Sequence, residues 1–469
     1  MAQSGVRFGT SGARGLVARM TNEVCYAYTA AFLQPLASDV NKVVLGHDLR
    51  PSSPAIASAC AAAITDAGGQ VVYAGALPTP ALALYAAKLG VPALVITGSH
   101  IPFDRNGIKF YRADGEITKA DEVAMQAAVV ALPDEVKPQS LPQPDEGATS
   151  YYRQRYLDFF GAGALAGMRV AIYEHSSVVR DLLRGILEAL GAQVISLGRT
   201  DTFVPIDTEA VRPEDVAQAR QWALQQLFDA ILSTDGDADR PLIGDEQGEW
   251  LRGDVVGILC AQYLNADRVV TPVSSNTAVE RCGLFKKVVR TRIGSPYVIA
   301  AMQAEPVVDS AVVVGYEANG GFLLGSAVTR NGRRLNALPT RDAVLPMLAL
   351  LCMARERGCK LSALTAQLPA RYTASHRLQD FPSEHSLKLI DRLLNDPSYA
   401  MQILAPNSGT IDQIDTTDGL RISFSNGDIV HLRPSGNAPE LRCYAEADSQ
   451  ASAQRLSDEC LRRLQEDRH

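Results

Sequence analysis

Short apolar runs alternate with longer segments of helical pattern over most of the chain. In the first part, the runs at residues 42–45, 70–73 and 93–97 have the length and composition of buried strands. The segments 53–67 and 79–89 between them have the periodicity of helices. This strand–helix–strand order predicts βαβ units in a mostly parallel, buried sheet.

The same alternation begins twice more along the chain. Further strands are expected at residues 168–173, 193–196, 229–234, 267–271, 287–289 and 311–315. Further helices are expected at residues 178–190, 215–227 and 253–264, from 274, from 295, and at 342–357. The three rounds therefore predict an α/β protein with three related α/β domains and mixed, mostly parallel sheets.

The C-terminal part of the chain has a different pattern. Candidate strands at 420–424, 429–432 and 441–445 follow one another closely, with Asn426–Gly427 as a hairpin turn, and a helix is expected at 451–465. This order predicts a smaller α+β domain. Linkers are expected at the proline-rich segment 133–147 and around 369–375, which places the domains at residues 1–147, 148–251, 252–369 and 370–469.

The composition favours a globular cytoplasmic enzyme without a nucleic-acid or membrane partner. The 469 residues carry a formal net charge of -7 with no block of like charge, which argues against non-specific nucleic-acid binding. The N-terminus lacks the apolar core of a signal peptide, and prolines and a lysine interrupt the most apolar stretch, residues 76–97. The eight cysteines form no CxxC pair, as expected for reduced, buried thiols.

Three polar, glycine-containing loops directly follow predicted strands, at residues 97–100, 235–240 and 315–321. Ligands of open α/β sheets bind outside the carboxyl ends of the strands. We therefore expect the chemistry of the protein in these three loops.

The loop DGDADR places Asp235, Asp237 and Asp239 within one short turn, and Gly236 allows a tight backbone there. Oxygen ligands alone favour Mg²⁺ or Ca²⁺ over zinc. The alternative is a solvated acidic turn, but this loop ends an apolar strand, where unpaired carboxylates would repel one another. An EF-hand is excluded because the glutamate at its twelfth position is missing.

The segment TGSHIPFDRNGIKF contains Ser99 and His100 after a strand, and Lys109 beyond an expected turn at Asn106–Gly107. A loop serine can act as a nucleophile or phosphate acceptor when a base or a metal assists it. Lysine suits acid/base work when burial or nearby cations lower its pKa. A serine after a strand is more often a cap or turn residue, so both interpretations stay open from the residues alone.

Two further segments are rich in arginine, hydroxyl groups and glycine: RFGTSGARG near the N-terminus and RPSGN at residues 433–437, with Arg442 beyond it. Such segments can grip a phosphate through guanidinium groups and backbone N–H groups, although a hairpin with surface arginines is the alternative. A metal, a serine, an acid/base pair and a phosphate grip together indicate phosphoryl transfer. No nucleotide-binding GxxxxGK[ST] loop or kinase signature is present.

Five motifs in order, RFGTSGARG, TGSHIPFDRNGIKF, DGDADR, GYEANGG and RPSGNAPELR, run along essentially the whole chain. In this order they resemble the α-D-phosphohexomutase family, which includes phosphomannomutases and phosphoglucomutases. The resemblance implies four domains around a central cleft, with three related α/β domains and a distinct fourth. It also implies an isomerase that interconverts hexose 1-phosphates and hexose 6-phosphates.

The resemblance assigns roles to individual residues. Ser99 would carry the phosphate, and Mg²⁺ would be bound by Asp235, Asp237, Asp239 and an oxygen of Ser99 or of its phosphate. The other implied catalytic residues are Arg14, His100, Lys109 and Arg240, of which His100 and Lys109 are the acid/base candidates. The implied substrate-binding residues are Gly294, Ser295, Glu317, Asn319, Arg433, Ser435, Gly436, Asn437 and Arg442.

The implied mechanism has two phosphoryl transfers through a bisphosphorylated sugar, with hexose 1,6-bisphosphate as activator. The only partner expected is a small sugar phosphate, bound by a monomer or a homodimer. Mannose phosphate is favoured over glucose phosphate. Phosphoglucomutase or dual-specificity activity is the alternative, followed by a phosphoglucosamine mutase, a metal-dependent phosphatase and a non-catalytic sugar-phosphate-binding protein.

The motifs depart from the usual family pattern at several positions. In the serine motif, Gly98 replaces the usual alanine and is expected to loosen the backbone. Ile101 replaces the usual asparagine. In the sugar loop Asn319 stands for serine, and Gly321 stands where some members have a histidine, which removes a candidate acid/base or sugar contact. Asn437 replaces the usual threonine of the phosphate loop.

Overall fold

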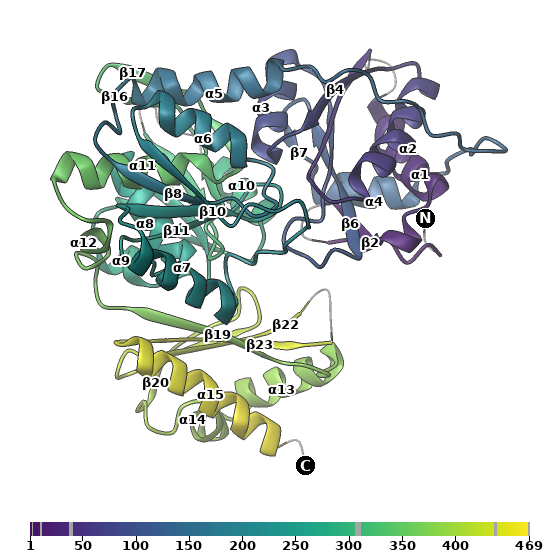
Figure 1. Ribbon diagram of the computed structural model, residues 1–469. Coiled ribbons are helices and arrows are strands. Elements are labelled where there is room, and N and C mark those ends of the chain that lie inside the picture. The colour runs from purple at the N-terminus through teal and green to yellow at the C-terminus, as the bar shows by residue number, and fades with distance from the viewer. Residues whose placement is uncertain (2, 10–11, 37–40, 305–310, 436–438, 468–469) are drawn as a thin grey trace. The chain divides into compact units, whose positions relative to one another are not determined.

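A computed structural model describes residues 1, 3–9, 12–36, 41–304, 311–435 and 439–467. The chain divides into two compact units (Figure 1). Unit 1 contains Met1–Asp267 and Gly294–Thr365, and unit 2 contains Arg268–Ile293 and Ala366–His469.

The first sheet of unit 1 has the strand order β1-β2-β6-β5-β3-β4, with β7 paired to β6. Its strands are β1 (Arg7–Phe8), β2 (Ala13–Leu16), β3 (Lys42–His47), β4 (Gln70–Ala76), β5 (Ala93–Ile96), β6 (Arg105–Arg112) and β7 (Gly115–Glu116). Its helices are α1 (Asn22–Leu33), α2 (Ser53–Asp66), α3 (Thr79–Leu89) and α4 (Lys119–Ala127), with short 3₁₀ helices at Val17–Arg19 and Gln34–Leu36. Strand β3 is parallel to β4 and β5, whereas β6 is antiparallel to β5. The strands and helices predicted in this region are confirmed.

The predicted turn at Asn106–Gly107 is wrong, because both residues lie inside strand β6. Asn106 is buried, and its amide nitrogen donates to the hydroxyls of Ser52 and Ser53. A side chain at Gly107 would come within 2.7 Å of the Ala13 carbonyl oxygen of the neighbouring strand β2. The pair therefore serves close strand packing, although the same two letters favour a hairpin turn elsewhere.

The rest of unit 1 contains a second sheet and a third group of strands. The second sheet, in the order β11-β10-β8-β9, has β8 (Arg169–Tyr173), β9 (Gln193–Leu197), β10 (Ala230–Thr234) and β11 (Pro241–Gly244), with α5 (Gly147–Phe160), α6 (Arg180–Ala189) and α7 (Pro213–Gln225). The third group has β14 (Val313–Tyr316), β15 (Phe322–Leu324) and β18 (Leu338–Asp342), the hairpin β16 (Val328–Arg330) and β17 (Arg333–Leu335), and the helices α8 (Gly253–Tyr263), α10 (Ser295–Gln303), α11 (Val344–Arg357) and α12 (Leu361–Thr365).

Each of these three groups repeats one local arrangement. A buried strand ends in a polar loop, and the chain returns as an antiparallel neighbour: β5 to β6, β10 to β11, and β14 to β15. These loops are the three that the sequence pattern singled out. The sheets are accordingly mixed, with parallel βαβ strands followed by an antiparallel strand.

Unit 2 contains the parallel pair β12 (Arg268–Pro272) and β13 (Lys287–Thr291), helix α9 (Ala278–Arg281), and an antiparallel sheet in the order β19-β23-β22-β21-β20. The sheet strands are β19 (Tyr372–Leu378), β20 (Ile411–Asp415), β21 (Leu420–Phe424), β22 (Ile429–Pro434) and β23 (Leu441–Ala447). Helices α13 (Ser383–Asn395), α14 (Pro397–Leu404) and α15 (Gln450–Glu466) cover one face of it (Figure 1). The hairpin turn at Asn426–Gly427 is confirmed between β21 and β22.

Two predictions in unit 2 need correction. The linker expected around 369–375 overlaps strand β19, which pairs along its whole length with β23. The helix expected from Ser274 begins only at Ala278, because Asn276 Oδ1 accepts the N–H of Ala278 and the segment before it forms a turn. Helices α13 and α14 and strand β20 were not predicted.

All eight cysteines are free thiols, and six of them are buried as predicted, whereas Cys282 and Cys359 are partly exposed. None of the helices in the described part of the chain has the length and apolar character that a membrane crossing requires.

Candidate functional site

Ser99 is held in an unusual backbone conformation directly after strand β5. It is fully buried and has φ of 53°, in the left-handed region that non-glycine residues rarely adopt. Its N–H donates to the hydroxyl of Thr97 at 2.8 Å, and that hydroxyl donates to Asp48 at 2.8 Å. Such a conformation persists only where the surroundings determine it, and it is typical of functional loops.

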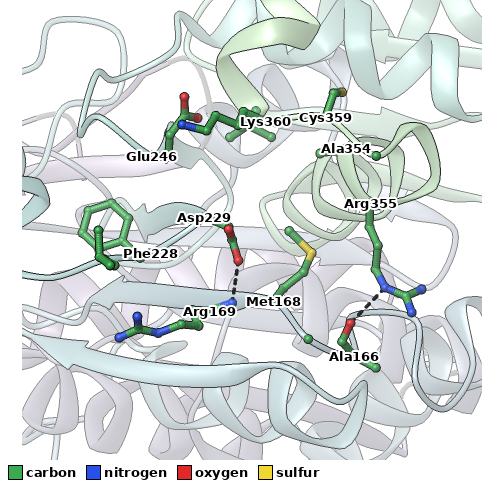
Figure 2. A pocket seen from close by; sticks show the side chains of 14 residues that line it. Ala166, Met168, Arg169, Phe228, Asp229, Glu246, Ala354, Arg355, Cys359 and Lys360 are labelled. Carbon is green, nitrogen blue, oxygen red and sulfur yellow. Dashed lines mark hydrogen bonds between the residues drawn. The ribbon is translucent and has the colours of Figure 1, made fainter.

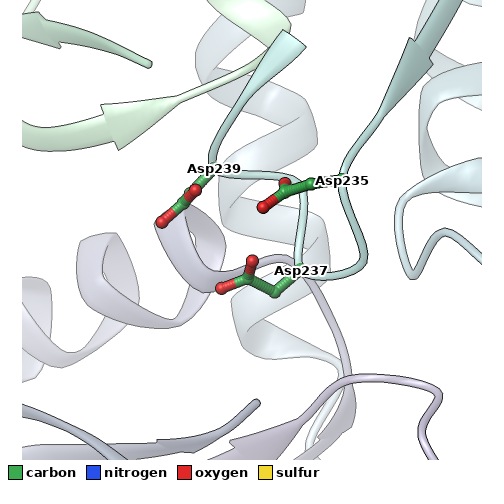
Figure 3. A group of neighbouring side chains, drawn as sticks. All are labelled: Asp235, Asp237 and Asp239. Carbon is green, nitrogen blue, oxygen red and sulfur yellow. The ribbon is translucent and has the colours of Figure 1, made fainter. Parts of the chain in front are cut away.

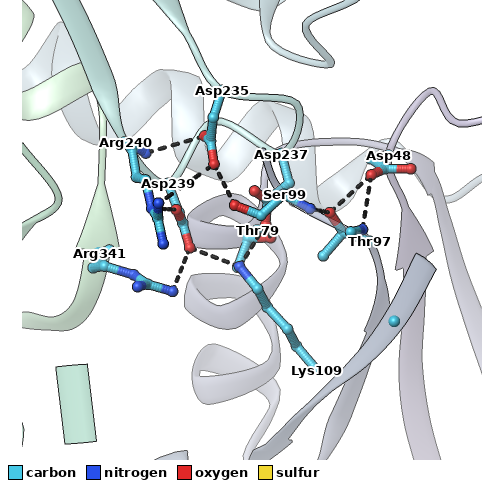
Figure 4. A network of polar contacts seen from close by, with 12 residues as sticks. Asp48, Thr79, Thr97, Ser99, Lys109, Asp235, Asp237, Asp239, Arg240 and Arg341 are labelled. Carbon is cyan, nitrogen blue, oxygen red and sulfur yellow. Dashed lines mark hydrogen bonds and ion pairs between the residues drawn. The ribbon is translucent and has the colours of Figure 1, made fainter. Parts of the chain in front are cut away.

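The side chain of Ser99 points at the acidic loop after strand β10. Its hydroxyl donates to Asp235 Oδ2 at 2.5 Å (Figure 4). Asp235, Asp237 and Asp239 are all buried, and one carboxylate oxygen from each lies within 4.8 Å of the others (Figure 3). The structure therefore brings the serine loop and the aspartate loop together.

This cluster has the donor set of a site for a hard cation. Asp237 Oδ1 is buried and has no hydrogen-bond partner among the residues that the structure describes. Three carboxylates and a serine oxygen are ligands that Mg²⁺ or Ca²⁺ accepts. The residues present thus fit a divalent cation.

Cations from three different strands or loops surround the aspartates. Lys109 of β6 places its ammonium 2.5 Å from Asp237 and 2.6 Å from Asp239. Arg341 of β18 lies 2.7 Å from Asp239, and the guanidinium of Arg240 lies 3.6 Å from the same residue. Figure 4 shows these side chains converging on the loop.

The environment separates the acidities of the aspartates. Burial, followed by repulsion from Asp237 and Asp239, raises the pKa of Asp235 well above its ordinary value. Burial alone would also raise the pKa of Asp239, but Arg341, Lys109 and Arg240 outweigh it and hold that pKa below the ordinary value. The Ser99 hydroxyl therefore faces the more basic carboxylate of these two.

His100 and Arg14 complete the polar wall of the site. His100 Nδ1 lies 3.0 Å from Arg240 Nη1 and 3.4 Å from the Ser99 hydroxyl. Burial and then the neighbouring Arg240 lower the pKa of His100 to about 3, so the neutral ring accepts from Arg240. Burial, Arg240 and Arg341 lower the pKa of Arg14 to about 10, and its Nε and Nη2 have no hydrogen-bond partner among the described residues. These donors suit a phosphate.

The sugar loop, which is the predicted loop at residues 315–321 after strand β14, is held closed by hydrogen bonds. Asn319 Oδ1 accepts the N–H of Gly321 at 3.0 Å, and the Asn319 carbonyl accepts the Thr208 hydroxyl at 2.7 Å. Glu317 is buried, and its Oε2 accepts a hydrogen bond from Arg341 Nη1 at 3.2 Å.

Gly294 and Ser295 lie at the start of helix α10 in the same unit. Gly294 has φ of 129°, and the Ser295 hydroxyl donates to Glu116 at 3.2 Å. Glu116 also accepts from the hydroxyl of Thr340, the residue before Arg341.

Arg341 is the main functional residue that the sequence analysis missed. Its guanidinium forms ion pairs with Asp239 of the aspartate loop (residues 235–240) and with Glu317 of the loop after β14. A side chain at Gly321 would come within 2.6 Å of Arg341 Cδ. Arg341 therefore passes through the space that a side chain at position 321 would need. No motif marks Arg341, which lies in an ordinary strand and reaches both partners only in the folded chain.

The predicted phosphate loop lies in unit 2. Arg433 and Arg442 are cross-strand neighbours on β22 and β23, and the N–H of Ser435 donates to the Glu440 carbonyl at 2.8 Å. Asp418 holds Arg433 Nε at 2.8 Å and also accepts the N–H of Ile293 at 3.0 Å. Gly436 and Asn437 lie outside the described residues.

Of the predicted site residues, unit 1 brings together Arg14, Ser99, His100, Lys109, Asp235, Asp237, Asp239, Arg240 and Glu317, with Asn319 in the Glu317 loop. A crevice of about 540 Å³ elsewhere in unit 1 contains none of them (Figure 2). Its walls include Met168, Phe228 and Lys360, and its polar groups do not converge on a common point. The predicted site residues of unit 1 therefore lie away from this crevice.

Comparison with protein families gives three matches along the chain. The descriptions are phosphoglucomutase/phosphomannomutase alpha/beta/alpha domain I over residues 5–131, alpha/beta/alpha domain III over 252–372, and C-terminal domain over 367–463. The chain belongs to the α-D-phosphohexomutase family. The resemblance inferred from the five motifs is thereby confirmed.

Relatives within the family narrow the activity. A phosphomannomutase of Salmonella muenchen is 52% identical over 453 residues, covering 96% of this chain and 94% of the relative. A phosphomannomutase of Sinorhizobium fredii (strain NBRC 101917 / NGR234) is 45% identical over 462 residues, covering 96% and 97%. This phosphohexomutase is a phosphomannomutase-type hexose phosphate mutase, and hence an isomerase.

A solved structure shares the fold. The phosphoglucomutase/phosphomannomutase family protein of Burkholderia thailandensis superposes with a TM-score of 0.76 at 22% identity, covering 97% of this chain and 96% of that one. The architecture of the phosphohexomutase is therefore that of the family.

Replacing Arg341 with methionine tests the bridge between the metal and sugar loops. We expect the free energy of unfolding to fall by about 3 kcal/mol, because two buried carboxylates lose their shared cation. We also expect kcat/KM to fall at least about tenfold, because Asp239 and Glu317 are no longer held together. Urea unfolding and mutase kinetics check this, with Arg334→Met at an exposed position of β17 as control. Unchanged kinetics in the Arg341 variant would contradict the bridge.

Proposed function

We propose that the protein interconverts mannose 1-phosphate and mannose 6-phosphate through phosphorylated Ser99 and a bisphosphorylated sugar. The observation that carries the proposal is the buried Ser99 hydroxyl, which donates to Asp235 in a cluster of three aspartates. The 52% identity to a phosphomannomutase over 96% of the chain supports the choice of sugar.

The proposed reaction moves one phosphoryl group out and another back. The bond between phosphorus and Ser99 Oγ breaks as a sugar hydroxyl bonds to phosphorus, and that hydroxyl gives its proton to a base. Ser99 Oγ takes up a proton as it leaves. After the bisphosphate turns over, Ser99 Oγ gives up that proton and bonds to the other phosphorus. The bond from that phosphorus to the sugar oxygen breaks, and the sugar oxygen takes up a proton. We propose Lys109 and His100 as the acid/base candidates, since both lie beside Ser99 or its aspartate partners.

The remaining charged groups would stabilise the transferring phosphate. Arg240 lies beside His100 and the aspartates, and Arg14 has donors in the same wall that find no hydrogen-bond partner among the described residues. In phosphoryl transfer, positioning and charge neutralisation supply most of the rate enhancement. These two arginines are therefore proposed to neutralise the oxygens of the transferring group.

We further propose that Asp235, Asp237, Asp239 and Ser99, or its phosphate, bind Mg²⁺. A bound Mg²⁺ supplies charge neutralisation at the phosphoryl oxygens. Structures of the N-acetylphosphoglucosamine mutase of Aspergillus fumigatus, which shares the fold with a TM-score of 0.61, were obtained with GlcNAc-6P and magnesium and with glucose 1,6-bisphosphate. Those ligands support Mg²⁺ and a hexose 1,6-bisphosphate activator here.

Substrate recognition is proposed to use two sets of residues. Gly294, Ser295, Glu317 and Asn319 would contact the sugar, and Arg433, Ser435, Gly436, Asn437 and Arg442 would bind the phosphate that does not react. Paired arginines on neighbouring strands and a loop closed at Ser435 support the second set.

The four domains at residues 1–147, 148–251, 252–369 and 370–469 stay a prediction.

The sugar preference is tested with mannose 1-phosphate and glucose 1-phosphate at equal concentration, in a coupled assay with Mg²⁺ and a trace of hexose 1,6-bisphosphate. We expect kcat/KM to be several-fold higher for mannose 1-phosphate. The sugars differ in the orientation of one hydroxyl, and a net hydrogen bond contributes about 1 kcal/mol. Equal rates would identify a dual-specificity enzyme, and no turnover of either sugar would overturn the proposal.

Replacing Ser99 with alanine tests the phosphoserine. We expect mutase turnover to be abolished while the thermal unfolding midpoint changes little, because one hydroxyl is removed from an otherwise intact loop. Intact-mass measurement after incubation with glucose 1,6-bisphosphate should show an added phosphoryl group in the parent protein and none in the variant. Ser58→Ala, within helix α2, is the control. Substantial remaining turnover in the Ser99 variant would refute this role.

Metal binding is tested without turnover. We expect millimolar Mg²⁺ to raise the thermal unfolding midpoint, because a ligand that binds only the folded state stabilises it. Chelation should reverse the increase, and Asp237→Asn should abolish it. Asp229→Asn, outside the aspartate cluster, is the control. An equal shift in the Asp237 variant would place the bound Mg²⁺ elsewhere.

A further inference from the structure

Arg50 is a fully buried arginine that contacts the backbone of the serine loop. It lies between strand β3 and helix α2, and only 1% of its surface is exposed. Its Nη2 donates to the carbonyls of Ser99 at 2.8 Å and Ile101 at 2.6 Å. Its Nη1 donates to the carbonyls of Pro102 at 2.8 Å and Arg105 at 3.0 Å. One side chain thus holds four carbonyls of the segment that carries the nucleophile.

Asp48 holds the other side of the same loop. Its Oδ2 accepts from Arg50 Nε at 3.2 Å, from the Thr97 hydroxyl at 2.8 Å and from the N–H of Gly98 at 3.3 Å. The N–H of Ser99 is held through Thr97, and its carbonyl is held by Arg50. Both peptide groups of Ser99 are therefore fixed, which accounts for a left-handed conformation at a serine.

Gly98 provides the space that Arg50 occupies. A Cβ atom at position 98 would come within 2.6 Å of Arg50 Cζ and 2.7 Å of its Nε. Gly98 is buried and its N–H is bound by Asp48, whereas the expectation that this glycine loosens the backbone stays a prediction. A glycine at position 98 thus leaves the space that the guanidinium fills.

Arg50 also connects the serine loop to the aspartate loop by packing. Its guanidinium lies over the ring of Phe203, with 4.0 Å between Cζ and the ring centre. The same ring lies within 3.3 Å of where a Cβ at Gly236 would stand, next to Asp235 and Asp237. A shift of Arg50 would therefore disturb both partners of the Ser99–Asp235 hydrogen bond.

We propose that Arg50 is a positioning residue for phosphoryl transfer, which keeps Ser99 Oγ aimed at Asp235, and that Gly98 is required because it makes room for Arg50. This inference rests on the proposed role of Ser99. Arg50 contacts none of the residues proposed to bind the sugar or its second phosphate in the hydrogen bonds and ion pairs of the described residues. Its loss should therefore lower kcat and leave KM for the sugar phosphate nearly unchanged.

The test compares Arg50→Lys, Gly98→Ala and the double variant. A lysine cannot reproduce the guanidinium fork, and an alanine at 98 displaces it. We expect each single variant to lower kcat about 100-fold with KM changed less than about twofold, since small misplacements of reacting groups have effects of this size. In the Arg50→Lys background, Gly98→Ala should lower kcat by no more than about twofold further, because both substitutions remove the same contact.

Two matched controls accompany these variants. Gly185→Ala lies in helix α6 with no atom within 4 Å of the added methyl group. Arg330→Lys removes a guanidinium that likewise bonds a backbone carbonyl and a carboxylate, those of Tyr263 and Glu356. Both controls should retain parental kcat, which shows that neither kind of substitution is harmful in itself.

Hydrogen–deuterium exchange of the peptide over residues 97–105 separates this inference from the proposed function. Faster exchange there in Gly98→Ala and Arg50→Lys, together with non-additive losses of kcat, supports the positioning role. Additive losses, unchanged kcat, or a rise of KM in place of a fall of kcat would overturn it. If Arg50→Lys does not fold, Gly98→Ala carries the kinetic and exchange tests. Activity retained in Ser99→Ala would refute the phosphoserine, whereas exchange would still report on the loop.

Discussion

The balance of charge around three buried carboxylates is the constraint on which the rest of the site depends. Asp235, Asp237 and Asp239 are removed from water and lie close enough to repel one another. Burying uncompensated charge is strongly unfavourable, so such a cluster requires cations with good geometry. Lys109 and Arg341 supply them from strands β6 and β18, which belong to different sheets or strand groups. The charge balance therefore links all three α/β parts of unit 1.

This constraint also bears on the position of Ser99. Asp235, whose pKa is raised by burial, accepts the Ser99 hydroxyl, and Ser99 makes this hydrogen bond from a left-handed backbone conformation. Asp48, Thr97 and Arg50 hold that backbone on both sides. The same preorganisation suits phosphoryl transfer, in which the protein contributes mainly position and charge. The left-handed conformation of Ser99 and the cluster of charges beside it are thus both consistent with a mutase activity.

At the sugar loop, the side chain of Arg341 fills the space beside Gly321. Arg341 passes beside Gly321, and its guanidinium joins Glu317 to Asp239. The loop is held closed by the hydrogen bond from the Gly321 N–H to Asn319 Oδ1. The carboxylate of Glu317 in this loop is connected to Asp239 of the aspartate loop through Arg341. Arg341 therefore links the loop at residues 315–321 to the aspartate loop at residues 235–240.

The sequence by itself determined the parallel strands and helices of the βαβ units, the three loops after β5, β10 and β14, and the family. Those features depend on local periodicity and on short motifs, which need no knowledge of distant contacts. The Asn106–Gly107 turn failed because those two letters fit a hairpin turn as well as a tightly packed strand, and only the neighbouring strand β2 distinguishes them. Helices α13 and α14 lay in a segment for which no element was predicted.

Only the tertiary structure decided which residues work together. Ser99 and Asp235 are 136 positions apart, Lys109 and Asp237 are 128 apart, and Arg50 reaches carbonyls about fifty positions away. Arg341, Arg50 and Asp48 belong to no motif that the sequence analysis used, so their importance depends on contacts formed after folding. The physical reason is that charge compensation and steric fit act through space, whereas sequence patterns report only neighbours along the chain.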